Sequence, residues 1–147
     1  MNHIKQIAAQ LAKYHIDAML VNSEPGEFYA VGLHGEGMAV ITRDAARYIT
    51  DSRYIEAARE SVAEAEVVMV DHARNYAALV NEFLDAHSVK TLGIEDGYMS
   101  LAQYNGLKDT LHAGLIPANG LVVGLRAAKG EEEFSRMVEA QRIKQRT

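Results

Sequence analysis

The chain has 147 residues, about one domain's worth, and its 48% hydrophobic and 24% charged residues are typical of a globular protein. This composition excludes disordered, collagen-like and low-complexity classes. Fifteen Lys and Arg against twenty Asp and Glu give a formal charge of −5, which argues against a nucleic-acid-binding protein. The absence of cysteine excludes disulfides, thiolate zinc sites and cysteine catalysis.

Neither the hydropathy nor the N-terminus suggests a membrane or secreted protein. No apolar run approaches the ~20 residues that a spanning helix needs, and no signal-peptide pattern begins the chain. We therefore expect a cytoplasmic protein. The charge divides the chain unevenly, because residues 1–125 sum to 9 − 16 = −7 and residues 126–147 to 6 − 4 = +2. We expect a domain over 1–125 and a different kind of segment over 126–147.

The first quarter of the chain predicts a helix, a buried strand and a turn. Asn2 is a candidate N-cap for a helix whose apolar stripe runs from Ile4 to Leu11. The continuous apolar run 18–21 is typical of a strand buried on both faces. Turn residues at 23–26 then predict a break in the chain.

The next segments predict a hairpin followed by alternating strands and helices. Runs 38–42 and 47–50 flank Arg43-Asp44, as in a β-hairpin, and Asp51 is a candidate N-cap for the following helix. Later strands are expected at 66–70, 91–95 and 115–117, and later helices at 76–84, 100–111 (with a Ser100–Gln103 capping box), 121–125 and 130–147. This order predicts an α/β fold with a mixed sheet flanked by helices on both faces.

The glycine-rich stretch 32–37 does not match a nucleotide-binding loop. A P-loop needs Lys and Ser or Thr after its glycines and a helix next in the chain, whereas here a strand comes next. His34 and Glu36 imitate the His-x-Glu of zinc deaminases, but that site also requires two cysteines. We therefore interpret the stretch as a tight, mobile loop.

The ionisable residues form no pattern of a catalytic or metal site. The histidines are scattered without metal-ligand spacing. Glu95 and Asp96 are adjacent at a strand end, so their side chains point to opposite faces. Asp51, Asp71 and Glu95 are the best candidates for a nuclease-type carboxylate cluster, although caps and turns explain the first two more simply. We expect no metal site and no catalytic residue in this chain.

The segment Thr50-Asp51-Ser52-Arg53-Tyr54 leaves two interpretations open. Asp51 caps a helix and Arg53 is a surface arginine, which is the interpretation that we favour. In the second interpretation, Arg53 reaches a carboxylate or carbonyl group.

Several segments, taken in order, resemble one family. They are 17–22, 29–33, 50–54, 92–95, 100–107 and the stretch Leu125-Arg126-Ala127-Ala128-Lys129-Gly130-Glu131-Glu132-Glu133-Phe134. Together they resemble the N-terminal, creatinase-type domain of prolidases and aminopeptidases P, which cleave the bond before proline. The resemblance covers essentially the whole chain and implies the creatinase/prolidase N-terminal fold, with RNase-H-like topology.

The resemblance also implies a second domain after this one. The segment 126–147 would be the junction and the truncated first helix of a C-terminal catalytic domain that this chain lacks. That domain would hold two divalent metals (Mn, Co or Zn) on Asp, His and Glu ligands, and a metal-bridged hydroxide would be the nucleophile. This chain alone is therefore expected to be inactive, with its own catalytic domain, a homodimer partner and short proline-containing peptides as its partners.

The function implied is that of a non-catalytic N-terminal domain that builds a homodimer and forms a wall of the active-site entrance. His34 and, second, Arg53 are the candidate entrance residues. Two alternatives remain: a peptide- or protein-binding module of a catalytically dead relative, and the N-terminal domain of a creatinase-like C–N hydrolase. Only the metal ligands of the catalytic domain separate the last alternative from a peptidase.

Overall fold

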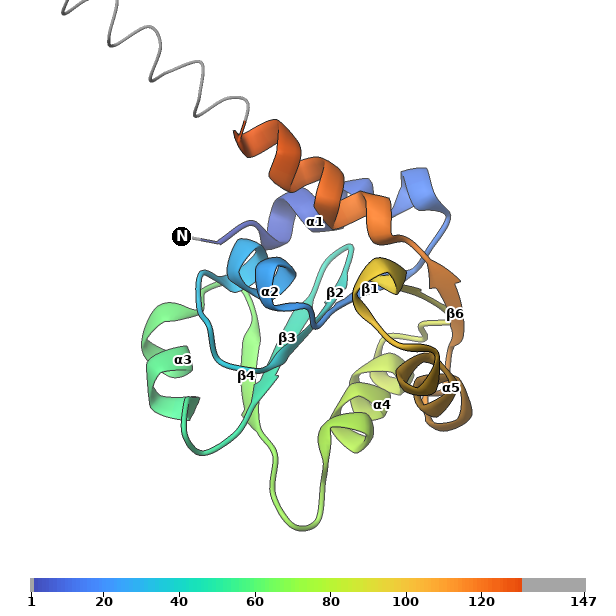
Figure 1. Cartoon of the computed structure of the whole chain (residues 1–147). Helices are drawn as coiled ribbons and strands as arrows, with labels where there is room; N and C mark the ends of the chain where they lie inside the picture. Colours follow the sequence, from blue (N-terminus) through green and yellow to red (C-terminus); the bar gives the residue numbers. More distant parts are fainter. Residues whose placement is uncertain (1, 131–147) are drawn as a thin grey trace, which may run out of the picture.

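Six strands form one mixed sheet, in the order β4-β3-β2-β1-β5-β6 (Figure 1). The computed structural model describes residues 2–130. Its strands are β1 Ala18–Val21, β2 Met38–Thr42, β3 Ala46–Thr50, β4 Glu66–Met69, β5 Thr91–Ile94 and β6 Gly114–Pro117. Strand β2 is antiparallel to β1 and β3, and the remaining neighbours pair in parallel. The β3-β2-β1-β5-β6 order, with β2 reversed, is the expected RNase-H-like arrangement, and β4 extends it at the β3 edge.

Helices cover both faces of this sheet. They are α1 Ile4–Gln10, α2 Glu24–Val31, α3 Ile55–Ser61, α4 Tyr76–Ala86 and α5 Leu101–Thr110, with short 3-10 turns η1 Ala12–Tyr14 and η2 Asp96–Tyr98. Residues 119–130 are also helical and cross above α1 in Figure 1.

Alternating side chains of β1 place a separate hydrophobic cluster on each face. Met19 and Val21 pack with residues of α1, α2, α3 and helix 119–130, whereas Ala18 and Leu20 pack with α4. Because successive residues of a strand point to opposite faces, a central strand that is apolar throughout needs cover on both sides. The predicted α/β architecture is thus confirmed.

The predicted turn at 23–26 is wrong, because helix α2 begins there. Ser23 is its N-cap and its Oγ accepts the Gly26 N–H at 2.9 Å, while Pro25 lies in the first turn. Ser and Pro are as typical of a helix start as of a turn, so this short motif alone does not distinguish the two. Gly32, with φ of 72°, ends the helix in a left-handed conformation.

Two of the predicted N-caps are wrong, and the predicted capping box is confirmed. Helix α3 starts after Tyr54, and Asp51 instead accepts the backbone N–H of Arg53 at 2.9 Å in the preceding turn. His3, not Asn2, is the N-cap of α1 and makes no side-chain cap. The Ser100–Gln103 capping box is present at the start of α5 as predicted.

The last described helix is longer than the turn predicted at 121–125. It runs over residues 119–130 and is continuous across the predicted domain boundary at 125/126. That boundary stays a prediction. The helix expected from Gly130 onward lies, apart from Gly130 itself, outside the described residues.

A buried carboxylate fixes the loop between α2 and β2. The Glu27 side chain, on α2, accepts the N–H groups of Gly35 (3.2 Å) and Gly37 (2.7 Å) and the hydroxyl of Tyr48 on β3 (2.5 Å). Thr50 also donates its hydroxyl to the Gly35 carbonyl at 2.8 Å. The loop predicted to be mobile is therefore held by hydrogen bonds to Glu27 on one side and to Thr50 on the other.

The loop glycines allow a close approach between the loop and β3. A Cβ on Gly35 would lie 2.4 Å from the Tyr48 hydroxyl, and one on Gly37 would lie 2.4 Å from the Ile49 carbonyl oxygen. Real Cβ atoms essentially never come this near, and a backbone carbonyl in a sheet has little room to move. Position 37 therefore requires glycine, and a side chain at position 35 would have to displace the buried Tyr48 hydroxyl.

We predict that Gly37→Ala destabilises the domain. The added methyl group would meet the Ile49 carbonyl, and overpacking of this kind costs about 1–3 kcal/mol of unfolding free energy. The matched control is Gly106→Ala in α5, where a Cβ meets nothing within 4 Å and alanine favours the helix by up to ~1 kcal/mol. Urea unfolding of both variants measures this difference, and equal midpoints would contradict it.

We also predict a loss of stability at high pH that depends on Tyr48. Burial and the Glu27 carboxylate raise the pKa of Tyr48, so the folded protein keeps the phenol proton that the unfolded chain releases near pH ~10. The unfolding free energy should therefore fall above that pH, by up to ~1.4 kcal/mol per pH unit for one tyrosine.

Urea titrations from pH 8 to 11 measure this slope. The Tyr48→Phe variant should show a shallower fall than the wild type, because it has no phenol proton to retain at this position. Identical slopes above pH ~10 in the two proteins would disprove this assignment.

Candidate functional site

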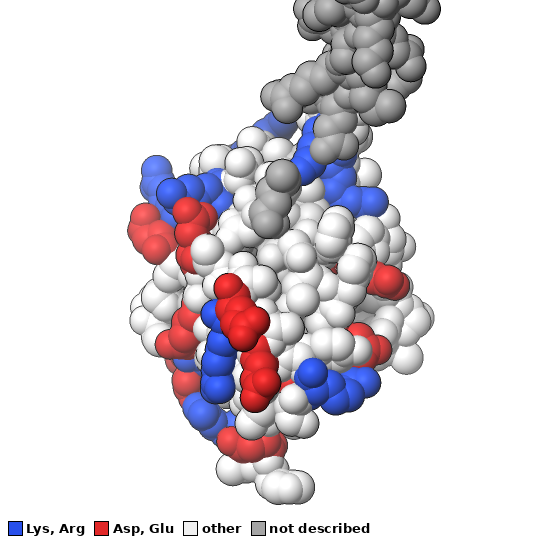
Figure 2. All heavy atoms as spheres, turned by 90° about the vertical axis from the view of Figure 1, so that its left-hand side faces the viewer, with Lys and Arg blue, Asp and Glu red and all other residues white. Residues whose placement is uncertain are grey.

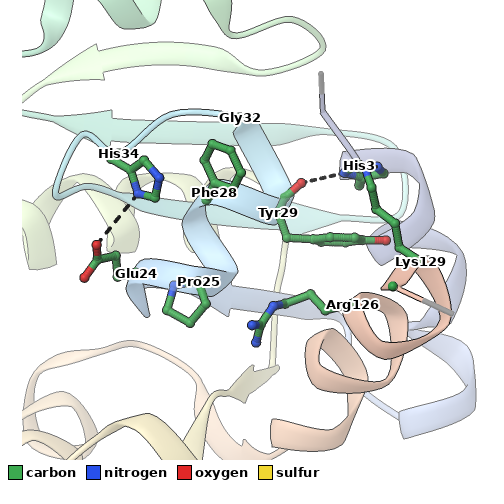
Figure 3. A pocket seen from close by; sticks show the side chains of 10 residues that line it. His3, Glu24, Pro25, Phe28, Tyr29, Gly32, His34, Arg126 and Lys129 are labelled. Atoms are coloured by element: carbon green, nitrogen blue, oxygen red, sulfur yellow. Dashed lines mark hydrogen bonds and ion pairs between the residues drawn. The ribbon is translucent and has the colours of Figure 1, made fainter. Parts of the chain in front are cut away.

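His34 lies at the tip of the loop that Glu27 anchors, on the outer side of α2 (Figure 3). Its ring stacks on Phe28 with centroids 4.4 Å apart and planes 5° apart. Its Nδ1 lies 3.9 Å from the Glu24 carboxylate. Phe28 is 50% exposed, so the pair presents an aromatic surface to the outside.

Arg53 lies in a network of carboxylates beside the same loop. Its Nε and one terminal nitrogen donate to the two oxygens of Asp51 at 3.1 and 2.8 Å, and that terminal nitrogen also lies 2.7 Å from Glu36. The bond with Asp51 is the main cause that raises the pKa of Arg53 and lowers the pKa of Asp51. Arg53 thus reaches carboxylates, as the second of the two open interpretations proposed.

The structure brings the two predicted entrance residues to one loop without joining them directly. Glu36 links Arg53 to the loop, two residues beyond His34. Across residues 2–130, no hydrogen bond or ion pair connects His34 with Arg53. His34 therefore presents its ring to the surface, whereas Arg53 supports the loop.

A cavity of about 680 Å³ opens between α2 and helix 119–130 (Figure 3). Its lining is mostly apolar or aromatic at the centre and charged at the ends. The lining residues are His3, Glu24, Pro25, Phe28, Tyr29, Gly32, His34, Arg126, Lys129 and Gly130. Arg53 is not among them.

Polar contacts fix three of the side chains that line this cavity, those of His3, Lys129 and Arg126. The His3 ring stacks on Tyr29 at 4.2 Å, and its Nδ1 lies 2.7 Å from the Tyr29 carbonyl oxygen. Its other nitrogen, Nε2, lies 3.3 Å from the Lys129 ammonium. Arg126, one turn earlier in the helix, donates to the Tyr98 hydroxyl at 3.3 Å.

A second, more acidic hollow of about 570 Å³ adjoins the other side of His34. Glu24, Glu27 and Glu36 contribute to its wall, with Tyr54 and Tyr76. Burial raises the pKa of the Tyr76 hydroxyl. His34 and Glu24 line both hollows.

The carboxylates considered for a nuclease-type cluster have separate structural roles. Asp71 accepts the N–H groups of Ala73 and Arg74, which lowers its pKa. Glu95 is 1% exposed and accepts from the backbone of Asn22 and from both the backbone and hydroxyl of Ser23. Within residues 2–130, no group of three or more His, Asp or Glu side chains is placed to hold a metal ion.

The sequence did not reveal the importance of several residues. Glu27 was not among the predicted site residues, and its burial depends on donors that lie 8, 10 and 21 residues later in the chain. Its spacing from Ser23 is a usable signal, because a Ser N-cap followed by acidic residues indicates a helix start. No local signal places Arg126 beside α2.

The surface beside the site carries mixed charge. Figure 2 shows acidic and basic side chains side by side on the face that includes α3. No described helix is long and apolar enough to cross a membrane.

A family model and a curated relative match this chain. The model of the creatinase/prolidase N-terminal domain matches residues 3–128. The uncharacterised peptidase YqhT of Bacillus subtilis is 32% identical over 130 residues, which are 87% of this chain. The aligned part is 36% of that relative, so this chain spans about a third of its length.

Solved structures agree with this match. An Xaa-Pro dipeptidase from Bacillus anthracis is 28% identical with a TM-score of 0.77, over 84% of this chain and 34% of that one. An Xaa-Pro aminopeptidase from Streptococcus pyogenes is 27% identical with a TM-score of 0.74, over 83% of this chain and 93% of that one. The sheet, the helices and the matched residues agree, and the chain belongs to the creatinase/prolidase N-terminal domain family.

Proposed function

We propose that this chain is the non-catalytic N-terminal domain of a cytoplasmic, metal-dependent Xaa-Pro dipeptidase or aminopeptidase. The observation that carries the proposal is the family match over residues 3–128, together with the 32% identity to a peptidase of which the aligned part is only 36%. Two divalent metals (Mn, Co or Zn) would be held by the C-terminal catalytic domain of such proteins. They would supply an activated water as the nucleophile.

The role of this domain would be to form a wall of the entrance to the active site. The anchored loop supports this role, because a wall that selects short peptides must keep its shape. The Phe28–His34 stack gives the wall an exposed aromatic surface beside a cavity. His34 would orient the peptide, since its ring can donate and accept hydrogen bonds near neutral pH. Arg53 would act indirectly, by holding Glu36 and hence the loop.

The surface also favours contacts with other parts of the whole protein. Phe28, Tyr98, Leu101 and Val123 are large apolar side chains exposed by 37–75%. A partner that covered these side chains would remove their apolar surface from water, which is favourable. We assign these contacts to the protein's own catalytic domain and to a second subunit of a homodimer.

The identity of the curated relative favours a peptidase over a creatinase-like C–N hydrolase. The family description covers both creatinases and prolidases, whereas that relative is called a peptidase. The third possibility is a peptide-binding module without catalysis, which would hydrolyse neither a peptide nor a creatine-like substrate.

We predict that the full-length protein hydrolyses Ala-Pro or a longer Xaa-Pro peptide when supplied with Mn²⁺, and that the present chain alone does not. Chromatography of the released N-terminal amino acid measures turnover by the full-length protein and by the present chain. Turnover of creatine but no peptide would identify a C–N hydrolase. No turnover of either would favour the binding module.

We further predict that His34→Ala lowers kcat/KM of the full-length protein for a proline peptide about tenfold, which is ~1.4 kcal/mol. The matched control is His112→Ala. Its side chain is 56% exposed and faces one carboxylate, as His34 is 58% exposed and faces Glu24. Steady-state kinetics with both variants tests the role. A kcat/KM for His34→Ala within about twofold of wild type would leave His34 no part in substrate binding.

A further inference from the structure

The cavity between α2 and helix 119–130 has charges of opposite sign at its two ends (Figure 3). Arg126 and Lys129 lie three residues apart, so both project from one side of the helix. Glu24, beside His34, contributes a carboxylate at the other end. Such an arrangement is complementary to a ligand that itself carries a negative and a positive end.

The positive end has donors placed for a carboxylate. Among residues 2–130, no carboxylate pairs with Arg126, whose contact with the Tyr98 hydroxyl occupies one nitrogen of a guanidinium with five N–H donors. A guanidinium binds a carboxylate with two parallel hydrogen bonds, which makes this a strong interaction.

His3 orients Lys129 at the same end. The Tyr29 carbonyl oxygen can only accept, so His3 Nδ1, 2.7 Å away, carries the ring proton. The neutral ring then leaves Nε2 as an acceptor for the Lys129 ammonium, 3.3 Å away. The ammonium is therefore held at the cavity by a fixed partner.

The centre of the cavity suits an apolar group. Pro25 and the half-exposed ring of Phe28 lie between the charged ends (Figure 3). A volume of about 680 Å³ lies within the usual range of small-ligand sites. The ligand therefore has a carboxylate, a short apolar body and an ammonium group.

The geometry points to a binding site for a short peptide with both termini free, which we infer lies with its carboxylate on Arg126 and Lys129 and its ammonium at Glu24. Its apolar side chains pack on Phe28 and Pro25. This inference rests on the proposed function, which makes short peptides the molecules that this domain meets. The site would hold peptides at the domain surface and would favour those with unblocked ends.

The test is a titration of the 147-residue chain with Ala-Pro, followed by backbone amide NMR. The expected result is saturable shifts of amides in α2 and in helix 119–130. Prolyl amide in place of the free carboxylate, and an acetyl group on the N-terminus, should each weaken binding at least tenfold. Equal binding of the blocked peptides, or no saturable shifts at the cavity, would overturn the inference.

Variants locate the carboxylate contact. Arg126→Gln should weaken Ala-Pro binding about tenfold and abolish the preference for the acid over the amide. Tyr98→Phe is the matched control, because it removes the same Arg126–Tyr98 hydrogen bond but keeps the guanidinium. Arg59→Gln, at an exposed position of α3, controls for the change in net charge. Both controls should bind as wild type, and a loss in Tyr98→Phe equal to that in Arg126→Gln would assign the effect to structure.

Failure of this inference can be distinguished from failure of the proposed function. Peptide binding is measured on this chain, whereas peptidase activity is measured as turnover by the full-length protein. Turnover without binding here would reject the site and keep the peptidase. Binding without turnover would keep the site and identify a binding module.

Discussion

The carboxylate of Glu27 is the group on which the site region depends. It is 3% exposed, and an unpaired carboxylate at such a depth would cost several kcal/mol. Two loop amides and the Tyr48 hydroxyl surround it. These donors come from the loop and from β3, so satisfying one charge joins three elements. The loop conformation is therefore a consequence of burying Glu27.

A second buried carboxylate fixes the residues that lead into the same helix. Glu95, at the end of β5, accepts the backbone N–H groups of Asn22 and Ser23 and the Ser23 hydroxyl at 2.6 Å. A negative charge is favourable at this end, because the first N–H groups of a helix have no partner within it. A Cβ on Gly26 would lie 2.4 Å from Glu95, so the helix can approach this closely only with glycine there.

These two anchors make α2 a rigid platform for the residues on its outer side. Phe28 and Glu24 project from that side, and the loop after α2 returns His34 to stack on Phe28. An entrance wall and a peptide site both require side chains held in one arrangement before the ligand arrives, since ordering them on binding would weaken affinity. The apolar ring of Phe28 remains exposed on a surface whose backbone is fixed.

The sequence by itself determined the features that are encoded within short windows. The hairpin of β2 and β3, the stripe of α4 and the capping box at Ser100 arise from periodicity and local hydrogen bonding. The order of six short segments, from 17–22 to 125–134, also indicated the family, which the match over residues 3–128 confirms.

The tertiary structure alone decided how distant residues meet. A Ser-Pro motif is compatible with a turn or a helix start, and only packing of α2 on the sheet selects the helix. Glu27 is buried because Tyr48, 21 residues away, supplies a donor. The cavity joins α2 to Arg126, almost a hundred positions later in the chain. Local sequence fixes backbone conformation over a few residues, whereas a binding site depends on where the packed core brings separate segments together.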